Sequence, residues 1–266
     1  MNLIDVHCHL NHEQFKADLD QVLERAKKAG LKAILVSGVN PPSNRAVLEL
    51  AKKYPLIKAS LGIYPIDALG IQPDGVGLPS HKGEINLEEE FVFFEKNKNH
   101  ITAIGEAGMD FHWAKKEETY EKQAENFQKI IRFAIKIKKP LIIHSRKAET
   151  ECVQILSEEV HQEIPIIQHC FSGNKTAIRR AAELRHYFSI PPNILKSSNF
   201  QTLVKIVDLQ QLLTETDAPW LSPFKDQRNE PAFVLETIQK IAEIKQLPME
   251  EVAAHIWENY ERIFVF

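Results

Sequence analysis

Cysteine is scarce in this chain, and long apolar runs are missing. The three cysteines, Cys8, Cys152 and Cys170, form no C-x-x-C pair, which argues against a disulfide framework or a structural zinc knuckle. No apolar run approaches the roughly 18 to 20 residues needed to cross a bilayer. The opening MNLIDVHCHL also lacks the basic-then-apolar layout of a signal peptide. The sequence therefore predicts a cytoplasmic protein with no membrane partner.

An excess of positive charge is also lacking. The formal net charge is -3, which argues against coating nucleic acid through a broad basic face. A nuclease is still compatible with this charge, because metal ions in a carboxylate-lined pocket supply local positive charge that the amino-acid count misses. Hydrophobic residues make up 44% and charged residues 26%, as in ordinary globular proteins.

The chain length and the hydrophobic pattern predict the fold. A chain of 266 residues matches one eight-stranded (β/α)8 TIM-type barrel, which predicts a single domain over residues 1–266. Short apolar, β-branched runs alternate with segments of helical period, as in repeated βα units. The predicted strands are residues 4–9, 33–39, 57–63, 101–106, 141–144, 166–169, 187–190 and 212–217. Helical patterns at 231–244 and 249–262 close the chain.

The end of the first predicted strand carries an H-x-H pair. Side chains two apart on a strand share a face, so His7 and His9 project toward one point. Cys8 alternates to the opposite face, which predicts a buried small hydrophobe. Taken alone, the pair is equally compatible with a structural role.

Four later predicted strands also end in a potential metal ligand. These residues are Glu106, His144, His169 and Asp217. Active sites of β/α barrels gather at the carboxyl ends of the strands, so chance placement of six such residues at five strand ends is hard to credit. We expect them to form one site.

The types of these six residues predict the chemistry. Four imidazoles and two carboxylates suit zinc, manganese or magnesium, and they are too many for one tetrahedral site. Two divalent metal ions are therefore expected. A carboxylate bridges two cations where an imidazole does not, which points to Glu106 as the shared ligand. Asp217 is expected either to ligate the first metal or to take a proton from the attacking water. Glu106 and Asp217 are thus the predicted catalytic residues.

Six motifs together resemble the TatD family of metal-dependent hydrolases, within the amidohydrolase-like barrels. They are DVHCHL at residues 5–10, GEAGMD at 105–110, IHSR at 143–146, HCFSG at 169–173, ETDAP at 215–219 and RNEP at 228–231. The resemblance spans nearly the whole chain in the family's order. It implies a metal-dependent barrel hydrolase acting on ester bonds, chiefly a deoxyribonuclease that often removes nucleotides from a 3′ end, with DNA bound locally at the barrel rim.

The resemblance also implies how the ligands divide. His7, His9 and Asp217 would hold one metal, His144 and His169 the other, and Glu106 would bridge them. This chain departs from the family at the third strand, where G-I-H-P-H is usual and residues 62–66 read GIYPI. Tyr64 and Ile66 thus replace two histidines that serve as phosphate contacts. The loop at 67–86 is longer, and it is either a lid or binding loop or a surface insertion.

Further residues are candidates for substrate binding. Arg146 follows a predicted ligand and either pairs with a phosphate or braces a nearby carboxylate. Trp220, and in the same way Trp113, either stacks on a base or packs at the rim. Arg228 and Asn229 either position substrate or brace their loop.

Two competing functions fit the same sequence. One is hydrolysis of a small ester, amide or lactone on the same barrel. Several such families bridge their metals with a carboxylated lysine, and no lysine occupies a predicted strand end here. The other is a scaffold that binds metal without turnover, for which a complete ligand set would be unnecessary.

Overall fold

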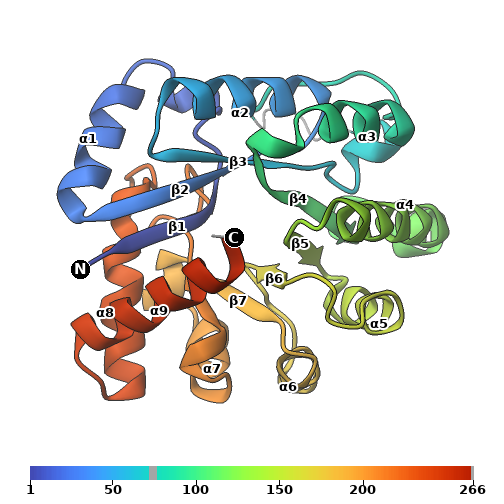
Figure 1. The fold of residues 1–266 in the computed structure, drawn as a ribbon. Coiled ribbons are helices and arrows are strands. Elements are labelled where there is room, and N and C mark those ends of the chain that lie inside the picture. Colours follow the sequence, from blue (N-terminus) through green and yellow to red (C-terminus); the bar gives the residue numbers. More distant parts are fainter. Residues whose placement is uncertain (72–76, 265–266) are drawn as a thin grey trace.

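A parallel barrel forms the centre of the molecule. The computed structural model describes residues 1–71 and 77–264, and in these ranges eight parallel strands lie in the order β1 to β8 (Figure 1). The backbone N–H groups of Thr216 and Asp217 donate to the His7 carbonyl at 3.3 and 2.9 Å and draw the last strand to the first. The strands are β1 Leu3–Cys8, β2 Leu31–Ser37, β3 Ile57–Leu61, β4 Ile101–Asp110, β5 Leu141–Arg146, β6 Ile166–His169, β7 Tyr187–Ile190 and β8 Leu212–Thr214. The predicted (β/α)8 barrel is confirmed.

Helices surround the sheet on its outside (Figure 1). Their starts are encoded locally: Asn40, for example, accepts from Ser43 N at 3.0 Å and caps α2. The helices are α1 Leu19–Ala29, α2 Pro41–Lys53, α3 Leu87–Lys96, α4 Lys116–Ile137, α5 Glu149–Glu159, α6 Lys175–Glu183, α7 Ser198–Ile206, α8 Val234–Lys245 and α9 Met249–Phe264. Within the described ranges, no helix has the length and hydropathy to cross a bilayer.

The core lies between the strands and the inward faces of the helices. On α4, Phe127, Ile131 and Ala134 are buried against the sheet, as their helical spacing predicts. Tyr120, in the second turn of the helix, shares the same spacing but is 39% exposed. The crossover helices thus bury one apolar face each and fix the strand ends in space.

Two strand ends differ from the sequence-based expectation. β4 continues four residues past Glu106, because Asp110 still pairs in register with Arg146 on β5. β8 stops at Thr214, three residues before Asp217, which has a left-handed backbone with φ of 55°. Of the loop at 67–86, residues 67–69 form a short 3-10 helix, η2 (Asp67–Leu69), and residues 72–76 lie outside the described ranges.

Candidate metal centre

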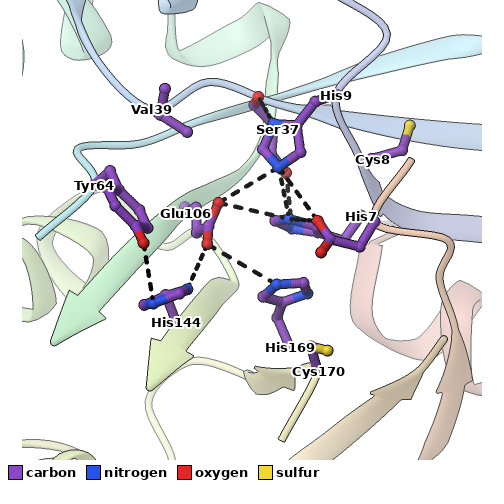
Figure 2. A network of polar contacts seen from close by, with 12 residues as sticks. His7, Cys8, His9, Ser37, Val39, Tyr64, Glu106, His144, His169 and Cys170 are labelled. Atoms are coloured by element: carbon purple, nitrogen blue, oxygen red, sulfur yellow. Dashed lines mark hydrogen bonds and ion pairs between the residues drawn. The ribbon is translucent and has the colours of Figure 1, made fainter. Parts of the chain in front are cut away.

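His7 and His9 meet two carboxylates at the mouth of the barrel (Figure 2). Their Nε2 atoms lie 3.2 Å apart. Glu106 Oε2 is 3.6 Å from His7 Nε2 and 3.5 Å from His9 Nε2. Asp217 Oδ1 lies at the same two distances, 3.6 and 3.5 Å. The H-x-H geometry expected from strand alternation is therefore present. Two carboxylates from later in the sequence, Glu106 and Asp217, complete the group.

The other oxygen of Glu106 faces a second pair of imidazoles. Glu106 Oε1 is 2.7 Å from His144 Nδ1 and 3.9 Å from His169 Nε2. Figure 2 shows the carboxylate between the two pairs, with His7 and His9 on one side and His144 and His169 on the other. The structure thus brings together all six residues that the sequence placed at strand ends.

Ser37, at the end of β2, fixes the rings of the first pair. Its hydroxyl lies 3.0 Å from His7 Nδ1, and its carbonyl accepts from His9 Nδ1 at 3.1 Å. Both histidines therefore turn Nε2 toward the carboxylates. Cys8 points the other way, with its thiol donating to the Leu35 carbonyl at 3.5 Å, and is fully buried as expected.

Buried carboxylates fix the rings of the second pair. His169 Nδ1 donates to Glu215 Oε2 at 2.7 Å, which leaves Nε2 facing the centre. His144 is oriented the opposite way, because its Nε2 donates to Asp110 Oδ2 at 2.9 Å and its Nδ1 faces Glu106. Such outer partners set the tautomer and raise the basicity of a ligating histidine.

The charges of the cluster are strongly coupled. Burial and the neighbouring His169 lower the pKa of His7 to about 4. Burial also disfavours charge on His144 and His169, but adjacent carboxylates prevail and raise the pKa of these two histidines to about 9 and about 10. Burial raises the pKa of Glu106 and Asp217, yet hydrogen bonds from histidines outweigh it, and both pKa values fall below the usual range. The cluster is therefore a buried site that favours positive charge.

The donor set fits divalent cations. Ligands at tetrahedral bonds of roughly 2.0 to 2.2 Å lie about 3.3 to 3.6 Å from one another. The contacts among His7, His9, Glu106 Oε2 and Asp217 Oδ1 fall at 3.2 to 3.6 Å. Among the described residues, two groups of three have donor atoms within 4.8 Å, namely His7, His9 and Asp217, and His7, Glu106 and His169. His144 contacts this second group through Glu106.

The cluster of histidines and carboxylates opens into a cavity of 1710 Å³, and three of the five predicted substrate contacts line it. These three are Trp113, Arg146 and Trp220. Arg228 and Asn229, which the structure describes, do not line this cavity. Arg228 pairs with both carboxylate oxygens of Asp18 at 3.0 and 2.7 Å, and Asn229 donates to the Thr216 and Trp220 carbonyls at 2.7 and 2.6 Å. These are the contacts of loop-bracing residues.

The segment after β3 supplies a wall of the cavity. Tyr64 lines it and donates its hydroxyl to Asp110 Oδ2 at 2.8 Å, whereas Ile66 is fully buried in the core. Residues 77–80, from the described part of the long loop, also line the cavity. The Pro79 carbonyl accepts from Asn40 at 2.9 Å. This part of the loop therefore forms part of the cavity wall.

Sequence reasoning missed Asp110 and Glu215 as partners of the candidate ligands. A period of two from Glu106 along β4 reaches Asp110, so continuing the strand beyond the first carboxylate would have found it. Glu215 lay inside a recognised motif, but its partner His169 is 46 residues away. Local pattern carries no signal for that pairing.

A parallel β/α barrel with histidines and carboxylates gathered at its carboxyl rim defines the class of metal-dependent barrel hydrolases. The model of one family, the TatD related DNases, matches residues 4–265. The chain belongs to this family of metal-dependent hydrolases.

Relatives match over almost their full length. The chain is 34% identical to the uncharacterized metal-dependent hydrolase YabD of Bacillus subtilis over 268 residues, with 98% of each chain covered. It is 31% identical to human deoxyribonuclease TATDN3, covering 99% of this chain and 95% of that protein. Among solved structures, YJJV, a TatD homolog from Escherichia coli, has a TM-score of 0.86 and 26% identity, with 99% and 98% covered.

Proposed function

We propose that this protein is a deoxyribonuclease that hydrolyses DNA phosphodiesters from the 3′ end with two divalent metal ions. The observation that carries the proposal is the position of Glu106, whose two oxygens face two separate histidine pairs. A carboxylate placed in this way supports a bridging role. The family match and the name of the human relative support DNA as the substrate.

Each side chain then has a role. His7, His9 and Asp217 would hold one ion, His144 and His169 the other, and Glu106 would contact both. Bound there, magnesium, manganese or zinc would lower the pKa of water and stabilise charge on the phosphoryl and leaving oxygens.

Asp217 would accept the proton of the attacking water. Its oxygen lies beside the His7 and His9 Nε2 atoms at 3.6 and 3.5 Å, and its lowered pKa keeps it ionised. Arg146, at the cavity wall, would pair with a phosphate oxygen through its planar guanidinium. Arg228 and Asn229 act indirectly, because they hold the loop that carries Trp220.

The test is release of nucleotides from end-labelled single-stranded DNA by EDTA-stripped protein reloaded with magnesium, manganese or zinc. We expect metal-dependent release from the 3′ end and its loss in Glu106→Ala. Glu243→Ala is the matched control, because it removes an exposed carboxylate on α8 that pairs with Lys240. Near-normal turnover of Glu106→Ala with saturating metal contradicts the bridging role. Bound metal without DNA cleavage contradicts the substrate and favours a small ester, amide or lactone. Bound metal without turnover of any ester would indicate a scaffold.

A further inference from the structure

Two tryptophans border the cavity. Trp113 lies just past β4 and is 51% exposed although it lines the cavity wall. The guanidinium of Arg146, at the end of β5, lies 5.7 Å from the centre of its ring. An exposed indole beside a cation at the mouth of a catalytic cavity is unusual, because a ring of this size normally buries most of its surface. It offers a flat apolar face next to a positive charge.

Trp220 occupies a corresponding position past β8. It also lines the cavity, and its ring lies 5.3 Å from that of His9 and 5.4 Å from that of His12. Its backbone N–H donates to the Asp217 carbonyl at 3.0 Å, and its carbonyl accepts from Asn229. The indole is thus fixed directly beside the candidate ligands.

The strand order places the segments that carry these two rings at opposite points of the rim. β4 and β8 are four strands apart in a barrel of eight, so the segments that follow them leave the rim at opposed points. Both tryptophans are anchored next to the candidate ligands. Trp113 N donates at 2.9 Å to Asp110 Oδ1, while Asp110 Oδ2 accepts from His144. Trp220 N donates to the Asp217 carbonyl. Their position relative to the ligands is therefore set by the fold.

We propose that Trp113 and Trp220 are base-stacking subsites on the two sides of the metal centre, and that each holds the base on one side of the bond cleaved. The inference rests on the proposed function and specifies its substrate. Bases stack on aromatic rings without sequence preference, and a net charge of -3 leaves little attraction from a basic face. Paired bases stack on one another, so duplex DNA is disfavoured.

The experiment compares thymidine with 5,6-dihydrothymidine, whose saturated ring is not planar and stacks poorly. Single-stranded oligonucleotides carry the replacement on the 5′ or the 3′ side of the labelled bond. Wild-type protein is assayed beside Trp113→Ala, Trp220→Ala and the control Phe224→Ala, which removes an exposed aromatic that does not line the cavity. Duplex of the same sequence is assayed in parallel.

We expect wild type to prefer thymidine at both positions and single strand over duplex. Each tryptophan variant should lower kcat/KM on the thymidine substrate roughly 5- to 140-fold. It should also lose the preference on one side of the bond and keep it on the other, whereas Phe224→Ala should behave as wild type.

A second readout avoids turnover. Short single strands should quench the tryptophan fluorescence of EDTA-stripped protein less in Trp113→Phe and in Trp220→Phe than in wild type, while Trp257→Phe, on α9, should leave the quenching intact. Wild type that cleaves both thymidine and dihydrothymidine equally overturns the stacking inference and leaves the nuclease proposal standing. Wild type that cleaves neither with any metal overturns both. Because the wild-type comparison needs no variant, poor folding of a variant does not affect this test.

Discussion

Asp110 controls how His144 faces the metal centre, and replacing it with asparagine should weaken metal binding. The Asp110 carboxylate is fully buried and accepts four hydrogen bonds, from Tyr64 OH, His144 Nε2 and the backbone N–H groups of His112 and Trp113. These donors outweigh burial and lower the pKa of Asp110 to about 2. The anion in turn helps to raise the pKa of His144 to about 9. Asp110→Asn removes the charge while keeping the shape.

The magnitude follows from the hydrogen bonds that each substitution weakens or removes. Replacing the partner of a metal-ligating histidine typically lowers metal affinity about 10- to 100-fold. Tyr64→Phe removes one hydrogen bond to the same carboxylate but keeps its negative charge and its contact with His144, so the loss of metal affinity should be smaller than for Asp110→Asn. We therefore expect metal affinity to fall in the order wild type, Tyr64→Phe, Asp110→Asn.

Isothermal titration of EDTA-stripped proteins with zinc or manganese measures these affinities directly. Tyr187→Phe is the matched control for Tyr64→Phe, because Tyr187 begins β7 at the opposite end of the barrel. Asp208→Asn, which changes an exposed carboxylate, is the control for Asp110→Asn. An Asp110→Asn protein that binds both equivalents as tightly as wild type would refute the assigned role of Asp110.

Three further predictions concern stability. Phe127→Ala, at a fully buried site on α4, should lower the free energy of unfolding by about 3 to 5 kcal/mol in urea titrations; a loss below about 1 kcal/mol would contradict its core position. Glu230→Gln weakens the paired contacts of 2.7 and 2.6 Å to Arg25, and because that arginine is half exposed, the expected loss is about 1 kcal/mol or less. Burial lowers the pKa of His186 to about 4. Between about pH 6.5 and pH 4 the unfolded chain therefore binds one more proton than the folded chain, and lowering the pH should reduce the free energy of unfolding by about 1.4 kcal/mol per pH unit from this group. A His186→Gln protein with the wild-type slope in that window would rule this out.

The local sequence pattern predicted most strands and helices, because the periodicity that marks each of them spans only a few residues. Short apolar, β-branched runs marked the eight strands, and helical spacing marked α4, α8 and α9. The ends of β4 and β8 were predicted less well. β4 is extended by its register with β5, whereas β8 ends at Thr214 and the chain takes a left-handed conformation at Asp217. Both effects come from neighbouring strands or from backbone geometry, which residue type does not encode.

The candidate site divides in the same way. The sequence alone determined that His7 and His9 share a face and that Glu106, His144, His169 and Asp217 follow apolar strands, because a parallel barrel brings all such positions to one rim.

Only the tertiary structure decided which ring nitrogen each histidine presents, because those choices depend on partners far along the chain. The Asp110 to His144 contact spans 34 residues and the Glu215 to His169 contact spans 46. Tertiary contacts also decided that Arg228 braces a loop through Asp18, 210 residues away, whereas Arg146 reaches the cavity. Residue type fixes what a side chain can bind, and the packing of distant segments fixes what it meets.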